Sequence, residues 1–151
     1  MKTEMPKKKV KMVKPVQVNC IIRGRKCKID IELAKLVEAL NKVDGITTNS
    51  GYFSHGQYDI KIWFNCDSIE NLNVFLWGFC FRWGCISIRQ DSDWIIMIDN
   101  ADTGCTSKFL RLLLIGKKKF TQKQCDKLAS QIELFVSEKE EYVKQIKNNK
   151  L

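Results

Sequence analysis

The sequence predicts an α+β fold, in which two or three helices pack on one face of a mostly antiparallel sheet and the last helix is long. Three observations predict it. Several short segments alternate apolar and polar residues, and three longer segments repeat apolar residues at helical spacing. The later strand segments are joined by connections of hairpin length, which favours antiparallel pairing.

The first half of the chain contains a strand pair, a helix and a further strand. Residues 16–31 alternate in polarity around an RGR turn, which is typical of a hairpin. Residues 31–43 carry leucine and valine at helical spacing, and Gly45 then stops the helix. Residues 46–57 are rich in glycine, asparagine and serine, so we expect a loop there that leads into a strand at 58–65.

The second half adds two helices and more strands. Asp67 or Ser68 can cap a second helix that ends near Gly84. Thr121 and Gln124 form a capping box, so the last helix begins there, and its end is expected to project and pair with another protomer. Three apolar segments between these helices are expected to be strands: CISIRQ, DWIIMID and KFLRLLLIG.

Length and charge indicate one domain with a basic extension. The chain has 151 residues and a formal net charge of +9. Residues 1–14 hold six lysines against one glutamate and form a basic, flexible arm, whereas residues 15–151 form a single domain. The arm either attracts polyanions such as nucleic acid or only makes the chain soluble. No apolar run suits a signal peptide or a membrane span, so we expect a cytoplasmic protein without a membrane partner.

The reactive residues indicate that the protein is not an enzyme. Seven cysteines lack any CxxC spacing, which favours buried free thiols over a zinc site. His55 is the only histidine, and Ser54 beside it is poorly placed to be its nucleophile. The chain lacks phosphate-binding glycine motifs, and its aspartates at 91, 93, 99 and 102 are typical turn formers. We therefore expect no catalytic residue, cofactor or metal.

Binding of an anion is better supported, because aromatic and cationic residues occur together. Aromatic rings stack on bases, arginine forks bind phosphate, and glycine-rich loops offer backbone amides. Trp63 and Trp77 lie on faces expected to be exposed, which indicates a ligand platform or a subunit contact. The opposing interpretation is that the tryptophans are core residues and the arginines are only solvated. The candidate ligand-binding residues are Gly51, Phe53, Ser54, His55, Gly56, Arg82, Trp83, Arg89 and Asn100.

A family resemblance extends over about residues 33–116. The segment LVEALNKVDGI, a T-x-S loop ending in HG, the strand IKIWF and the segment CDSIENLNVFL follow in order. They resemble a group of small phage-encoded proteins with a PGI-x-T turn, an S-C-x-G-H-G loop and an IWF strand. Ser50, His55 and Gly56 match that loop, whereas Gly51 stands in place of its cysteine and Ser54 in place of a glycine. The layout is also similar to the Thoeris anti-defence proteins of phages.

The resemblance implies a function without catalysis. The Thoeris anti-defence proteins are basic oligomers that sequester cyclic ADP-ribose isomers or cyclic oligonucleotides. We therefore expect a homo-oligomeric phage protein that sequesters a small nucleotide-derived immune signal in the host cytoplasm. Two alternatives stay open. One is an RNA- or DNA-binding protein linked to tRNA modification, and the other is a protein inhibitor that docks on a host enzyme.

Overall fold

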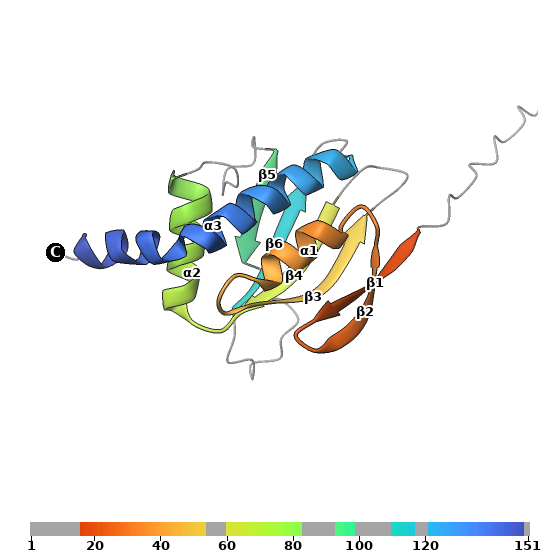
Figure 1. Ribbon diagram of the computed structural model, residues 1–151, viewed down its shortest axis with the longest axis horizontal. Helices are drawn as coiled ribbons and strands as arrows, with labels where there is room; N and C mark the ends of the chain where they lie inside the picture. The colour runs from red at the N-terminus through yellow and green to blue at the C-terminus, as the bar shows by residue number, and fades with distance from the viewer. Residues whose placement is uncertain (1–15, 54–59, 83–92, 99–109, 117–120, 150–151) are drawn as a thin grey trace, which may run out of the picture.

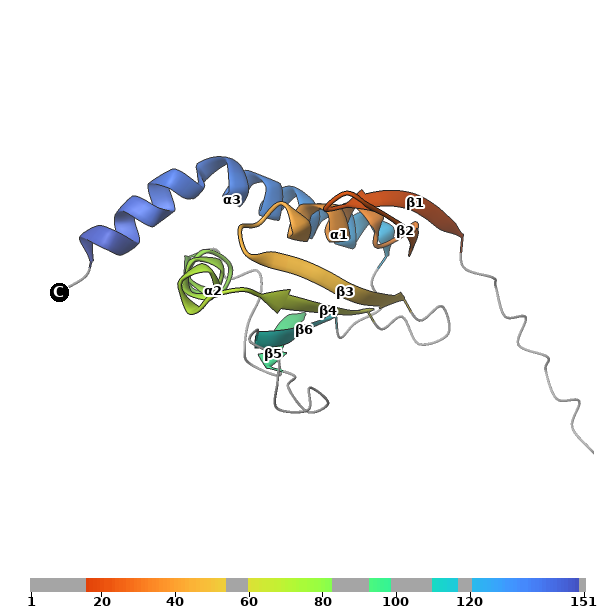
Figure 2. The ribbon, with the colours of Figure 1, turned by 90° about the horizontal axis from the view of Figure 1, so that it is seen from below.

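The computed structural model describes residues 16–53, 60–82, 93–98, 110–116 and 121–149. Their main element is a four-stranded antiparallel sheet with the strand order β3–β4–β6–β5. Helices α1 and α3 lie over one face of this sheet, and α2 packs on the same side (Figures 1 and 2). A separate two-stranded sheet, β1–β2, flanks α1 and β3. The α+β prediction is therefore confirmed.

The first two strands form the predicted hairpin. β1 (Gln17–Ile22) pairs with β2 (Arg25–Asp30), and the two residues between them have left-handed backbone conformations, with φ of 47° at Arg23 and 79° at Gly24. Such a two-residue turn matches the twist of the strands it joins. The Arg23 guanidinium donates a hydrogen bond to the Ile46 carbonyl at 2.5 Å. This bond ties the hairpin turn to the start of β3.

Helix α1 (Ala34–Asn41) and strand β3 (Ile46–Phe53) are linked by two hydrogen bonds of the Asn41 side chain. The Asn41 amide nitrogen donates to the Thr48 hydroxyl at 2.8 Å, and its oxygen accepts from the Thr48 backbone N–H at 3.1 Å. The prediction of a loop at 46–53 is therefore wrong. These residues form a strand because β4 and Asn41 satisfy their backbone groups, and pairing of this kind overrides local composition.

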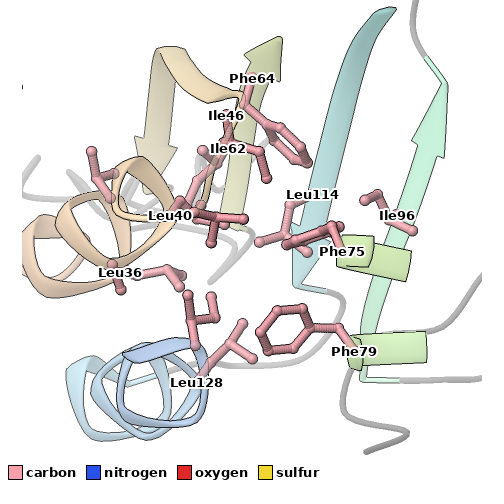
Figure 3. Packing of buried hydrophobic residues seen from close by; sticks show 14 of the residues in the cluster. Leu36, Leu40, Ile46, Ile62, Phe64, Phe75, Phe79, Ile96, Leu114 and Leu128 are labelled. Atoms are coloured by element: carbon pink, nitrogen blue, oxygen red, sulfur yellow. The ribbon is translucent and has the colours of Figure 1, made fainter. Parts of the chain in front are cut away.

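Strands β4 (Ile60–Cys66), β5 (Trp94–Ile98) and β6 (Leu110–Gly116) complete the main sheet. Residues of β4 are alternately buried and half-buried, as a strand with one core face requires. Ile62, Phe64 and Leu114 point toward the helices, with Ile96 beside them on β5 (Figure 3). The strand predictions for DWIIMID and KFLRLLLIG are confirmed, and the segment CISIRQ lies outside the described residues.

Helix α2 (Ile69–Leu76) begins as expected, with the Ser68 hydroxyl accepting from the Asn71 N–H at 3.1 Å. It continues as a π-helical segment, η1 (Trp77–Arg82). Helix α3 (Gln122–Asn148) begins at the capping box that the sequence predicts. Within the parts of the chain that are described, no helix has the length and apolarity needed to cross a membrane.

Candidate ligand-binding site

One end of the main sheet brings together distant parts of the chain. Phe53 pairs with Ile60, Ile60 with Gly116, and Gly116 with Trp94, so these four residues form a single row across all four strands. This row is the upper end of the sheet in Figure 1. Neighbouring strands lie about 4.8 Å apart, so the row spans roughly 14 Å. We call these four residues the end row.

The end row is where two of the predicted binding segments join the sheet. Residues 54–59 connect Phe53 to Ile60, and residues 83–92 connect the end of η1 to the residue before Trp94. Arg82 is the last residue of η1. Register therefore places both ends of the 54–59 segment and the C-terminal end of the 83–92 segment at one end of the sheet. Five of the predicted binding residues lie in these two segments, outside the described residues: Ser54, His55, Gly56, Trp83 and Arg89.

The attachment point of the Asn100 segment lies elsewhere. Asn100 is itself outside the described residues, but Ile98 before it pairs with Leu112. Leu110, which follows the segment, pairs with Cys66. Both attachment points are at the opposite end of the sheet from the end row. Register thus does not unite this segment with the other two.

Gly51 is part of a strand and not of the expected loop. It pairs with Ile62 in the β3–β4 ladder, and the prediction of a loop glycine is therefore wrong. A Cβ at this position would lie 3.4 Å from Leu33 Cδ1, which is tight but short of a clash. Gly51 also lines a small cleft of 130 Å³ between the β1–β2 hairpin and β3.

Trp63 and Trp77, which the sequence predicts to lie on exposed faces, have different surroundings in the structure. Trp63 lies on the sheet face away from the helices and is half-buried, in a cross-strand row with Leu113 and Met97. Trp77 packs against the hydrophobic core instead. A π-helical turn holds more residues than an α-helical one, so the α-helical periodicity no longer applies from Trp77 onward.

Three of the described thiols are poor nucleophiles. Burial raises the pKa of Cys125 to about 12 and also raises the pKa of Cys66. Burial, followed by a hydrogen bond with Glu38, raises the pKa of Cys20. Because the thiolate is the reactive form, these three groups are neutral and inert near pH 7. Within the described residues, no three His, Cys, Asp or Glu side chains are grouped so that they could hold a metal ion.

A cleft of 310 Å³ lies between the turn after α1, helix α2 and helix α3. Its floor is apolar, and lysines of α3 stand along its rim. Sequence reasoning missed this cleft because its residues come from three separate elements. The only sequence signal is a pair of lysines, Lys144 and Lys147, at helical spacing near the end of α3.

Comparison with known proteins adds no family to this description. No protein-family model, curated protein sequence or solved structure matches the chain.

Proposed function

We propose that this protein binds and sequesters a small nucleotide-derived anion, without catalysis, at the end row of the main sheet. The observation that carries the proposal is the register of Phe53, Ile60, Gly116 and Trp94. This register attaches a segment containing Ser54, His55 and Gly56 to the same end of the sheet as a segment containing Trp83 and Arg89. Without that register, the two segments would be unrelated parts of the chain.

The two segments supply complementary chemistry. The 54–59 segment offers a histidine N–H and the backbone amides around Gly56, which suit a phosphate or ribose. The 83–92 segment offers an indole for stacking on a base and the Arg89 fork for a phosphate. Lys61, one residue from the end row, adds a half-buried cation on the face away from the helices. Asn100 stays a prediction, because the strand before it leaves the sheet at the other end.

Absence of catalysis fits the chemistry of the described residues. A sequestering protein requires affinity and no reactive group, and the three buried thiols are neutral at physiological pH. The ligand class comes from the resemblance to phage anti-defence proteins, which suggests a cyclic ADP-ribose isomer or a cyclic oligonucleotide. On this proposal, the protein removes an immune signal before its receptor binds it.

Homo-oligomerisation is part of the same proposal. On β5, Met97 is 48% exposed and lies in one cross-strand row with Trp63 and Leu113, on the sheet face away from the helices. Apolar side chains on a sheet edge strand are typical of a surface that another chain covers. Pairing through this face would leave the helical side of each protomer unchanged.

The test combines native mass spectrometry with titration. Protein purified from bacteria that make such signals is weighed intact and then denatured to release any bound molecule. We expect a nucleotide-mass species at one per site, which also identifies the ligand and the oligomeric state. Calorimetric titration with that ligand should be weakened at least tenfold by Arg89→Gln and Trp83→Leu, because each removes a phosphate contact or a stacking face.

The matched control is Arg25→Gln, an exposed arginine on the β1–β2 hairpin, which should bind as the parent does. An empty protein from signal-producing cells, together with no heat of binding at millimolar ligand, would contradict the proposal. Equal weakening by the control would mean that net charge alone attracts the ligand.

Deletion of residues 1–14 separates this proposal from nucleic-acid binding. If the end row binds a small ligand, the deletion should leave its affinity unchanged. If the protein instead binds RNA or DNA through its six arm lysines, affinity for a polynucleotide should fall and its salt dependence should flatten. A filter-binding assay at several salt concentrations measures both quantities.

A further inference from the structure

The cleft between the three helices has an apolar floor. Val43, just after α1, and Phe135 of α3 are buried at its base. Val74 of α2 and Val136 of α3 are partly buried beside them and pack against the core. Its volume of 310 Å³ is at the lower end of the range of small-molecule sites. The floor therefore suits a compact hydrocarbon or aromatic group.

The rim of this cleft is cationic on one side. Lys139, Lys144 and Lys147 all line it from α3. The Lys139 ammonium is 2.5 Å from a carboxylate oxygen of Asp44, so its charge is already paired. Lys144 and Lys147 are exposed and form no ion pair with any residue that the structure describes. Three residues apart on a helix, they lie on the same side and can act on one anionic group.

The cleft is separate from the end row. Val43 and Asp44 precede Ile46, where β3 begins, and Asn71 belongs to the helix that follows β4. Both elements are at the opposite end of the main sheet from Phe53 and Ile60. The length of β3, 8 residues, places the two sites roughly 23 Å apart along the sheet.

We infer that this cleft is a second binding site, specific for an organic anion with an apolar body. The body would lie on Val43, Val74, Phe135 and Val136, and the carboxylate, sulfonate or phosphate group would face Lys144 and Lys147. Asp44 and Lys139 offset each other's charge in their ion pair, so Lys144 and Lys147 set the direction in which such a molecule binds. This inference goes beyond the proposed function and does not depend on it.

The experiment uses two fluorescent probes with the full chain. 8-Anilinonaphthalene-1-sulfonate carries an aromatic body and one negative charge, and N-phenyl-1-naphthylamine is a neutral compound of similar shape. We expect saturable binding of the sulfonate with one site per chain. The K144Q/K147Q double variant should weaken it by about threefold to tenfold and reduce its salt dependence, because two partly screened ion pairs are lost. Affinity for the neutral probe should change much less.

The matched control is K123Q/K127Q, which removes two exposed lysines from the first turns of the same helix, away from the cleft. It should bind both probes as the parent does, and thermal melting confirms that each variant is folded. The inference is overturned if the parent shows no saturable sulfonate binding, or if the two double variants behave alike. Retention of nucleotide binding by K144Q/K147Q would show that the two sites are independent, and loss of the end-row site would leave the probe result unchanged.

Discussion

Helix α3 packs against its two helical neighbours in different ways. Three ion pairs join it to α1 and the residues just after that helix: Lys35–Asp126 at 3.6 Å, Lys42–Glu133 at 2.9 Å and Asp44–Lys139 at 2.5 Å. Against α2 and η1 the contact is aromatic. The rings of Phe75 and Phe79 lie side by side (Figure 3), with their centroids 4.9 Å apart. The ring centroids of Phe79 and Phe135 are 4.7 Å apart.

The two kinds of contact have different effects: the aromatic contact stabilises the fold, and the ion pairs orient α1 and α3 relative to each other. The aromatic contact removes large apolar surfaces from water, at about 25 cal/mol per Å². The charged groups are mostly exposed, so their pairs contribute little to stability. Their order along both helices is the same, however, so they favour a parallel arrangement of α1 and α3 in one register. The aromatic contact should therefore contribute more to the free energy of unfolding than the three ion pairs do.

The largest effect is expected for Phe79→Ala. Phe79 is fully buried between Phe75 and Phe135, so its loss removes transfer free energy and leaves a cavity. We expect the free energy of unfolding to fall by about 3–5 kcal/mol in urea denaturation. Leu134→Ala is the control on the facing helix α3, since Leu134 is 47% exposed, and should cost far less. Equal costs for both variants would contradict the importance of the aromatic contact.

A smaller effect is expected for Gly78→Ala. A Cβ on Gly78 would lie 2.3 Å from Phe135 Cε2, so the ring must move. We expect a cost of about 1–3 kcal/mol in the free energy of unfolding. In a Phe135→Leu background the same change should cost much less, because the ring is gone and alanine is the better helix former. A cost that is the same in both backgrounds would show that the ring is not the cause.

The sequence predicts the helices and most strands because their signals are local. The Thr121–Gln124 capping box and the alternation in 60–66 are both present in the structure. Strand β3 was missed because the Asn-Ser-Gly run in its middle favours turns, and its pairing depends on β4 and on the distant Asn41. Trp77 was misplaced because a π-helical turn leaves no local signature.

The candidate sites show the same difference between local signals, which the sequence reveals, and contacts between distant segments, which it does not. Composition alone identified the loop around His55 and the segment with Trp83 and Arg89 as candidates for binding. Only the register of the four strands shows that both segments attach at the same end of the sheet. The cleft could not be predicted, since its floor is assembled from three elements that no spacing in the sequence connects.

Alkaline pH should lower the free energy of unfolding through Cys125, in the first turns of α3. Cys125 is buried there, and burial raises its pKa from 9.0 to about 12. Above pH 9 the unfolded thiol loses its proton while the folded one keeps it, so stability is full below pH 9 and falls between pH 9 and about 12. Each pH unit corresponds to at most about 1.4 kcal/mol for one group.

The measurement is urea denaturation at pH 8, 9 and 10 with the parent and Cys125→Ala. The variant is expected to start less stable but to lose less stability between pH 9 and 10. Cys20 and Cys66 have pKa values raised in the same direction, so some slope should remain. An identical slope in both proteins would show that Cys125 does not control this loss.

The smallest effect is expected at the Lys42–Glu133 pair. The two side chains are 55% and 49% exposed, so a double-mutant cycle with Lys42→Gln and Glu133→Gln should give a coupling below about 1 kcal/mol, and 1 M salt should abolish it. The hydrogen bond with Glu133 raises the pKa of Lys42, so this coupling is present at neutral pH and is lost as pH rises through the raised lysine pKa. A coupling of several kcal/mol that persists in salt would reverse the comparison. The charged contact would then stabilise α3 as strongly as the aromatic one, and its role could not be confined to orienting the two helices.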